Sequence, residues 1–199
     1  MKERPILFSA PMVKAILDGR KTVTRRVVKP QPPANAHQVE TWHHPDTKKP
    51  RFFTWTTAGE ISDQWEPLPC PYGQPGEKLL VRESIDALCG CDAEYVADGA
   101  RLVDAHPEGW DIWREGRDLP HRTIPSIHMP RWASRITLEV TGVRVERLGD
   151  VSESDARAEG VQSVAEFKEL WASINGPSSW DANPWVWVVE FKRVKGGAA

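Results

Sequence analysis

Hydrophobic residues are spaced along this chain with two periods, which predict helices in some segments and strands in others. Apolar residues at helical spacing lie between Ser9 and Gly19, so we expect a short helix that Ser9 caps and Gly19 ends. Residues 163–176 predict a longer amphipathic helix that Gly176 ends. Its apolar stripe consists of Phe167, Leu170, Trp171 and Ile174. Both helices are expected to pack one face against a core.

Strand patterns occupy three further segments. Residues 78–84 follow a Pro-Gly turn cluster and have an apolar centre. Apolar residues alternate in 134–148, which predicts either two strands separated at Gly142 or one bent strand. Residues 185–191 are almost wholly β-branched or aromatic and predict a closing strand. Strands interleaved with short helices, without a glycine-rich βαβ fingerprint, predict an α+β fold built on a small mixed β-barrel.

Two long segments have little periodicity. The first of these segments is 31–70. We interpret the proline-rich stretch 30–50 as a loop, and residues 52–55 could form a short edge strand. Residues 88–131 are expected to be a second loop-rich insertion, and 195–199 a flexible tail. At 199 residues the whole chain, 1–199, is predicted to be one domain carrying two insertions.

The densest group of cations follows the first predicted helix, in Gly19-Arg20-Lys21-Thr22-Val23-Thr24-Arg25-Arg26. From residue 1 to residue 30 there are eight lysines or arginines against two acids, although the formal net charge of the chain is only -2. A chain this close to neutral is not covered in positive potential, so any polyanion would bind at a local patch. The block 19–26 is the best candidate for a functional site.

The region after 148 predicts a third, short helix. Ser152 and Asp155 resemble a capping box, Gly160 closes the helix, and Glu159 lies at its end.

Cysteine usage and hydropathy indicate a cytoplasmic protein with no membrane partner. Lys and Asp residues interrupt the only early apolar segment, which excludes a signal sequence or a membrane span. The three cysteines (Cys70, Cys89 and Cys91) lack the spacing of a disulfide framework. With His106 they could form part of a zinc site, but ordinary thiols are favoured, and neither a metal nor another cofactor is expected.

The motifs in their order resemble the ASCH family, whose members share the PUA-like β-barrel. The resemblance rests on Gly19, Lys21, Thr24 and Arg26, on Pro75-Gly76-Glu77 before a strand ending in Arg82-Glu83, and on 187–191. Residues 127–135 extend it to the larger bacterial and prophage-encoded members. About half of the chain would belong to the common barrel, and the segments 31–70 and 88–131 would be insertions.

The resemblance implies that the block 19–26 lines a cleft beside the barrel that binds RNA or a modified nucleoside. Ligand-binding residues would be Arg20, Thr22, Arg25, Arg26 and Glu83. Some members of the family are amidohydrolases that remove an acyl group from N4-acylcytidine with a lysine, a threonine and a glutamate. Lys21, Thr24 and Glu159 match these three, with Glu153 and Glu166 as other choices for the acid.

This trio has a chemical basis. A threonine hydroxyl becomes a nucleophile when a neighbour takes its proton, a desolvated lysine has a lowered pKa, and a carboxylate can carry the proton to the leaving amine. In an extended strand Lys21 and Thr24 would face opposite ways, so they converge only if the backbone turns after Gly19. There are three alternatives to hydrolysis of this kind. The chain could bind nucleic acid or a nucleoside without turnover, through the cations and some of the ten tryptophans, or it could act as a ribonuclease. It could also have a purely structural or protein-interaction role with unknown protein partners.

Overall fold

The computed structural model is a mixed α+β structure with a mostly sheet core. It describes residues 3–32, 36–43, 50–57, 69–88, 92–106, 108–109 and 122–194. The chain divides into two compact units. Unit 1 consists of Met1–Gly19, Lys78–Leu138 and Arg193–Ala199, and unit 2 of Arg20–Glu77 and Glu139–Lys192. The predicted tail 195–199 lies outside the described residues.

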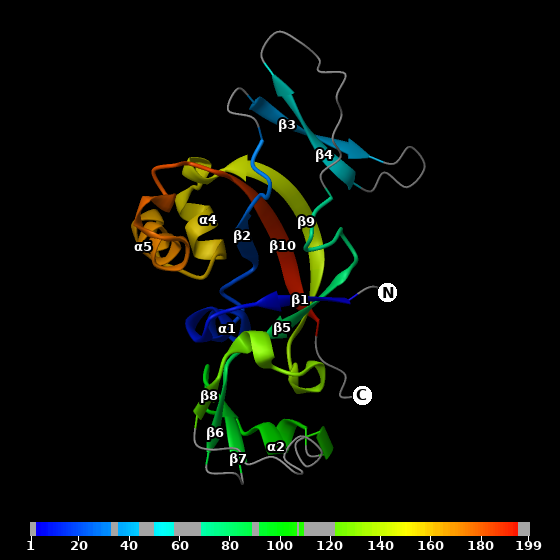
Figure 1. Ribbon diagram of the computed structural model, residues 1–199, viewed down its shortest axis with the longest axis vertical. Helices are drawn as coiled ribbons and strands as arrows, with labels where there is room; N and C mark the ends of the chain where they lie inside the picture. Colours follow the sequence, from blue (N-terminus) through cyan, green and yellow to red (C-terminus); the bar gives the residue numbers. More distant parts are fainter. Residues whose placement is uncertain are drawn as a thin grey trace. The chain divides into compact units, whose positions relative to one another are not determined.

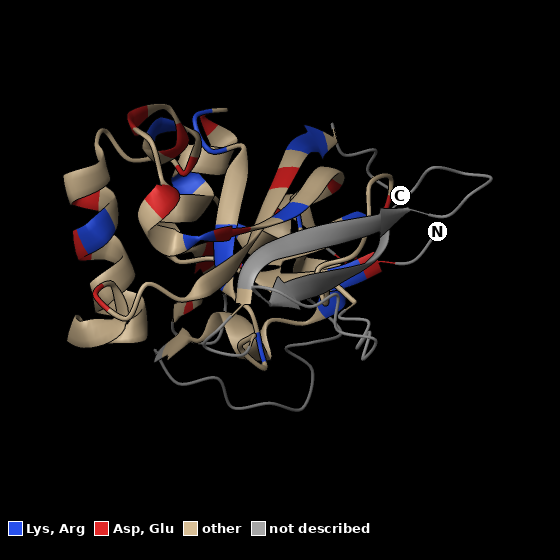
Figure 2. Cartoon of the chain, turned by 90° about the horizontal axis from the view of Figure 1, so that it is seen from above, with Lys and Arg blue, Asp and Glu red and all other residues tan. Residues whose placement is uncertain are grey.

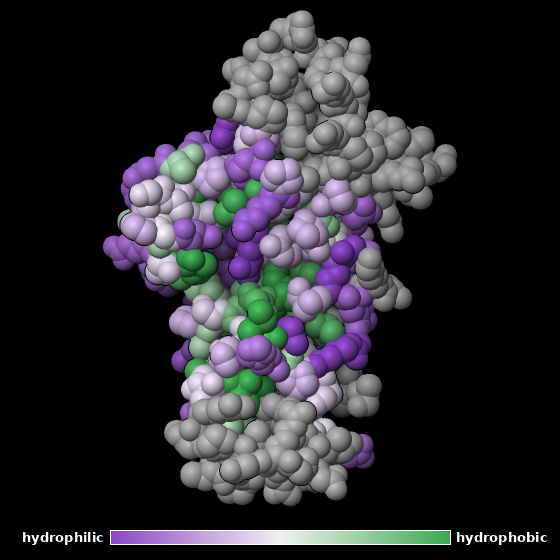
Figure 3. Space-filling model, viewed as in Figure 1, coloured by the Kyte–Doolittle hydropathy of each residue, from purple (hydrophilic) through white to green (hydrophobic). Residues whose placement is uncertain are grey.

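In unit 1, strand β1 (Glu3–Leu7) pairs in parallel with β5 (Lys78–Arg82), and α1 (Ala10–Leu17) follows β1 (Figure 1). The Val81 N–H donates to the carbonyl of Ile136, just before β9 (Thr137–Arg147). Val81 is 1% exposed, so the prediction that this strand crosses a core is confirmed. On the face drawn in Figure 3, hydrophobic residues gather over the region of α1 and β5.

Helix α1 begins and ends close to the predicted positions. Ser9 is its N-cap residue, but the Ser9 side chain makes no capping hydrogen bond, which corrects that part of the prediction. Pro11 occupies the first turn, where its missing N–H costs nothing. Gly19 has a φ of 74°, the left-handed conformation that a residue with a Cβ avoids, so the chain turns there as expected.

Unit 1 also contains a three-stranded sheet in the order β7-β6-β8. Its elements are β6 (Ile85–Leu88), β7 (Asp92–Tyr95), α2 (Leu102–Ala105), β8 (Arg122–Ile124), η1 (Ser126–His128) and η2 (Arg131–Ala133). Its core is Ile85, Ala87, Ala93, Tyr95, Leu102, Ile124, Met129 and Ala133. Much of the described part of 88–131 is therefore regular structure rather than loop. Strands of three or four residues are too short to give a readable alternation.

In unit 2, β10 (Trp185–Val194) lies between β9 and β2 (Val23–Val27), and β2 pairs antiparallel with β10. Strand β9 runs through Gly142 without a break, so the bent-strand alternative is the right one. A Cβ on Gly142 would lie 2.7 Å from Oε2 of Glu190, so a larger residue there would displace that carboxylate. The short helices η3 (Leu148–Asp150) and η4 (Pro177–Ser179) flank the helical segment.

The proline-rich stretch after β2 contains a strand that the sequence did not reveal. β3 (Ala36–His43) pairs antiparallel with β4 (Pro50–Thr57), with register shifts near both ends of β3. The prediction of a long loop over 30–50 is wrong for β3, while the expected strand at 52–55 is confirmed and extended. Among the described residues β3 and β4 pair only with each other, and the irregular register of such a ribbon leaves little alternation to read.

Two helices lie beside the strands of unit 2: α4 (Glu153–Ala158) and α5 (Val164–Asn175) (Figure 1). Ser152 and Asp155 form the predicted capping box, and Gly160 has a φ of 93°. In α5, Phe167 and Trp171 are buried as expected, whereas Ile174 is 59% exposed, which corrects the predicted apolar stripe. The helix therefore buries a narrower stripe than its sequence suggests.

The strand order β1-β5-β9-β10-β2 does not close on itself within the described chain. An α+β fold with a sheet core is therefore shown, and the closed PUA-like barrel stays a prediction. In the described parts of the chain, no helix has both the length and the apolar character needed to cross a membrane.

Candidate functional site

Lys21 and Glu159 form a buried ion pair in unit 2. Lys21 lies between α1 and β2, and Glu159 is the C-cap residue of α4, 138 residues further on. The Lys21 Nζ lies 2.5 Å from Oε2 of Glu159 and 2.8 Å from its main-chain oxygen. The two side chains are only 2% and 4% exposed. A lysine and a glutamate that the sequence analysis nominated thus meet within a dry environment.

Backbone contacts hold the two ends of this pair together. The Thr22 N–H donates to the Ala158 carbonyl at 2.8 Å, and the Thr22 carbonyl accepts from Phe191 of β10 at 2.9 Å. Arg20 adds a bond from Nη1 to the carbonyl of Gly160 at 3.0 Å. The start of β2 is therefore attached to both the end of α4 and strand β10. Arg20 and Thr22 themselves are exposed.

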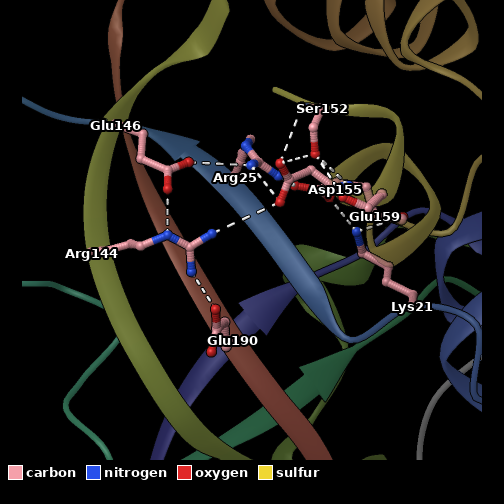
Figure 4. A network of polar contacts seen from close by, with 9 residues as sticks. Lys21, Arg25, Arg144, Glu146, Ser152, Asp155, Glu159 and Glu190 are labelled. Carbon is pink, nitrogen blue, oxygen red and sulfur yellow. Dashed lines mark hydrogen bonds and ion pairs between the residues drawn. The ribbon is translucent and has the colours of Figure 1, made fainter. Parts of the chain in front are cut away.

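Arg25 extends the pair into a network of charges (Figure 4). Its Nη1 lies 3.4 Å from Oε1 of Glu159, and its Nη2 lies 3.3 Å from both Glu146 and Asp155. Arg144 of β9 then contacts Glu146 and Glu190, with Asp155 at 3.9 Å. We refer to these residues as the Lys21 network. Its members are Lys21, Arg25, Arg144, Glu146, Asp155, Glu159 and Glu190.

Burial and neighbouring charges shift the pKa values of groups in and beside the Lys21 network. Desolvation lowers the pKa of Lys21 below its ordinary value, Glu159 opposes this shift, and the nearby Arg26 and Arg25 add to it. Burial also lowers the pKa of Arg26, against the effect of Tyr72 and Glu159. For Asp155, burial works toward a higher pKa, but hydrogen bonds from Ser152 and the charge of Arg25 leave the pKa lowered. A lysine in this position can give up its proton more readily than one in water.

Thr24, the predicted nucleophile, is buried at 3% exposure in β2, opposite Val189 of β10. Because side chains alternate along a strand, Thr24 and Arg26 share one face of β2 and Arg25 lies on the other. The structure thus joins Lys21, Arg25 and Glu159 and places Thr24 on the opposite face of β2 from Arg25. The alternation of side chains expected for an extended strand therefore holds for residues 24–26.

Glu83, predicted to bind ligand, belongs to unit 1 and has a different environment. It is 1% exposed, and Arg135 donates to both its carboxylate oxygens at 2.9 Å. Arg135 also donates twice to Asp98 at 2.9 Å and lies 3.9 Å over the Tyr95 ring. Burial raises the pKa of Glu83, and Arg135 opposes this rise. We call Glu83, Tyr95, Asp98 and Arg135 the Arg135 clamp.

The two alternative acids serve helix ends instead. Glu153 accepts from the Val164 N–H at 3.4 Å, and Glu166 accepts from the Gln162 N–H at 2.7 Å. Both are exposed, whereas Glu159 is buried. Of the three candidates, Glu159 alone has the desolvated lysine partner that the proposed chemistry requires.

The other predicted features contribute less to the site. Cys70 is buried, while Cys89 and Cys91 lie outside the described residues. His106 contacts the edge of the Trp132 ring in unit 1. Within the described ranges, no three His, Cys, Asp or Glu residues are grouped as a metal site would need. Among the tryptophans with described side chains, Trp171, Trp185 and Trp187 are buried and belong to cores rather than to a stacking surface.

Sequence reasoning missed the acids of the network other than Glu159. Asp155 was expected only as a helix cap, and Glu146 only as a strand residue. The spacing of Asp155 and Glu159, four residues apart on a predicted helix, was a usable signal, because it places two carboxylates on one helix face. Tyr72 was also missed. It lies close enough to Arg26 for the guanidinium to offset part of the rise that burial causes in the tyrosine pKa.

Comparison of the chain with protein-family models, with curated proteins and with solved structures found no match.

Proposed function

We propose that this chain is an ASCH-like amidohydrolase with a PUA-like fold, which removes an acyl group from a modified nucleoside of the N4-acylcytidine type. The observation that carries the proposal is the Lys21–Glu159 pair. Its Nζ and Oε2 atoms lie 2.5 Å apart, and the two side chains are only 2% and 4% exposed. Burial lowers the pKa of Lys21, and a desolvated acid–base pair of this kind is one arrangement that enzymes use for proton transfer.

The charge balance of the network supports a neutral substrate over a polyphosphate. Lys21 and Arg25 are buried, and carboxylates already pair with both. Figure 2 shows basic and acidic residues interspersed along the described ribbons. A site whose cations are already neutralised offers weak attraction to the closely spaced phosphates of RNA. An amide on a nucleoside needs no such attraction.

In the proposed reaction the pair first accepts a proton from the attacking hydroxyl, which belongs either to water or to Thr24. Because Thr24 lies on the opposite face of β2 from Arg25, the Thr24 route requires its side chain to be brought to the pair. The oxygen bonds to the acyl carbon, the bond from that carbon to N4 breaks, and the pair returns its proton to the leaving amine. With Thr24 as nucleophile an acyl ester forms and water then hydrolyses it. With water as nucleophile the carboxylic acid forms directly. Both routes consume one water and release cytidine.

The test is release of cytidine from N4-acetylcytidine by the wild-type chain, Lys21→Ala and Thr24→Ala. Wild-type turnover that falls about 100- to 10,000-fold in Lys21→Ala supports the pair as the proton-transfer group. Thr24→Ala separates the two routes, because a similar loss and an acyl adduct on Thr24 by mass spectrometry support the ester. A folded wild type without turnover on N4-acylated cytidines contradicts the proposal.

Binding of RNA or a nucleoside without turnover is the second candidate. It is favoured by the exposure of Arg20 and Thr22, which border the buried pair and could contact a phosphate and a sugar hydroxyl. Binding of single-stranded RNA that weakens steeply with salt, together with inert N4-acetylcytidine, would favour this candidate. Cleavage of the same RNA would indicate the ribonuclease alternative.

A further inference from the structure

Arg25 was expected to contact a ligand, but its side chain is fully buried and surrounded by carboxylates. We propose that Arg25 is a positioning residue for Glu159: its guanidinium bridges Asp155 and Glu159 on one face of α4 and so holds the Glu159 carboxylate against Lys21. The effect that we expect on turnover rests on the proposed function. The effect that we expect on the position of Glu159 rests on the geometry of the network alone.

The first argument is the division of the Glu159 carboxylate between two cations. Oε2 faces the Lys21 Nζ, and Oε1 faces Nη1 of Arg25 (Figure 4). A carboxylate with one partner can rotate about its last torsion, whereas a carboxylate with a different cation on each oxygen has one preferred orientation. Arg25 therefore determines which oxygen Lys21 meets.

The second argument is the rigid support of Arg25 itself. The residue lies in β2 opposite Val188 of β10, in a register without a bulge. Its Nη2 contacts Glu146 from β9 and Asp155 from α4. These two acids are in turn held, Glu146 by Arg144 and Asp155 by the Ser152 capping box. A planar guanidinium with several fixed partners has little freedom to move.

The third argument concerns α4, which is too short to fix its own C-terminus. Asp155 lies in the first turn of the helix, and Glu159 caps its end four residues later. Arg25 contacts both, so it ties the two ends of the helix to β2. A lysine at position 25 would keep one positive charge, but its single nitrogen cannot reproduce the fork that spans the two acids.

The experiment compares Arg25→Lys and Arg25→Gln with the wild type and with Arg157→Gln. Arg157 is an exposed residue of the same helix, outside the Lys21 network, and serves as the matched control. For hydrolysis of N4-acetylcytidine we expect kcat to fall about 10- to 100-fold in both Arg25 variants, with KM little changed, because a misplaced catalytic group costs this much. Wild-type kcat in Arg25→Lys would overturn the proposal.

A second measurement does not depend on turnover: the pKa of the Lys21 ammonium by NMR of ¹³C-labelled lysine, with the Lys21→Met spectrum assigning the signal. If Arg25 positions Glu159, then Lys21 loses contact with its counter-ion and its pKa falls in both variants. If Arg25 acts only as a nearby positive charge, the pKa rises in Arg25→Gln and is unchanged in Arg25→Lys, and the proposal is overturned. An inert wild type would refute the proposed function, and this titration would still decide the role of Arg25.

Discussion

The two units each bury a cluster of acids and cations, and the two clusters are built differently. In the Arg135 clamp, one guanidinium makes paired hydrogen bonds of 2.9 Å to Glu83 and to Asp98. In the Lys21 network, Arg25 reaches its three acids at 3.3 to 3.4 Å, while Lys21 lies 2.5 Å from Glu159. The clamp satisfies its central cation with matched partners, whereas in the network Arg25 divides longer contacts among three acids and Lys21 pairs with one buried carboxylate.

Under the proposed function, this difference separates a structural cluster from one that transfers protons. Arg135 stays charged because its hydrogen bonds to Glu83 and Asp98 outweigh the effect of burial and raise its pKa, so Arg135 itself does not transfer a proton. Lys21 has a lowered pKa despite its carboxylate partner. Two buried ion clusters in one chain therefore have opposite consequences, and burial alone does not identify a site. The type of cation and the sharing of its partners distinguish them.

The largest expected effect is on turnover. Glu159→Gln keeps the size of the side chain but removes the proton acceptor beside Lys21, so kcat for N4-acetylcytidine should fall about 100- to 10,000-fold. Glu169→Gln, an exposed change on α5, is the control and should retain wild-type kcat. Full activity in Glu159→Gln would make the Lys21 network as structural as the clamp.

The next effect is on stability, and it belongs to the clamp. Arg135→Met leaves the Glu83 carboxylate buried at 1% exposure without its counter-ion, which should cost about 3–5 kcal/mol of unfolding free energy. Urea unfolding followed by circular dichroism measures this loss. If Arg135→Met and wild type unfold at the same urea concentration, the clamp does not stabilise unit 1.

The pH dependence of stability should differ in sign between Lys21 of the network and Glu83 of the clamp. Burial lowers the pKa of Lys21 in the folded chain, so the unfolded chain holds that proton more readily and this residue's contribution grows as pH rises toward 10.5. Burial raises the pKa of Glu83, so its contribution is present below 4.5 and is lost as pH rises through the folded pKa. Unfolding of wild type, Lys21→Met and Glu83→Gln across pH separates the two, and slopes of the same sign would contradict this assignment.

The smallest effect is expected at the helix cap. Ser152→Ala removes the side-chain oxygen that accepts from the Asp155 N–H at 3.2 Å, which should cost about 1 kcal/mol. Because Arg25 still holds Asp155, kcat should change less than in either Arg25 variant. Thermal unfolding and the hydrolysis assay measure the two effects, and a larger loss of kcat than in Arg25→Lys would move the positioning role from Arg25 to the cap.

Local signals in the sequence were sufficient for the parts that local chemistry determines. The capping box at Ser152, the turns at Gly19 and Gly160, and the helix end at Glu159 all follow from residue types within one turn of each other. The strand β3 was missed because it is recognised by its backbone hydrogen bonds to β4, and such bonds leave no alternation of hydrophobic residues in the sequence.

The site was predictable only in part, for a physical reason. Lys21 and Glu159 could be nominated from motifs, but their contact depends on how β2 and α4 are held together across 138 residues. Glu83 and Glu159 are both glutamates. The sequence alone did not reveal that Glu83 pairs with Arg135 in unit 1 and not with the basic block 19–26. Arg25 was interpreted from its charge alone, because the three acids around it come from β9 and α4, which lie far from it in the sequence.

The most direct test of the central claim places Lys21→Met beside Arg135→Met in the same two assays, urea unfolding and N4-acetylcytidine hydrolysis. Lys21→Met removes the nearest partner of the buried Glu159 carboxylate, so this variant should lose up to about 3–5 kcal/mol of unfolding free energy, and the kcat of its folded fraction should fall by at least about 100-fold. Arg135→Met should show the stability loss in the unit that does not contain Lys21, and its folded fraction should retain turnover. A Lys21→Met variant that unfolds like Arg135→Met while its folded fraction turns over at the wild-type rate would show that both clusters are structural.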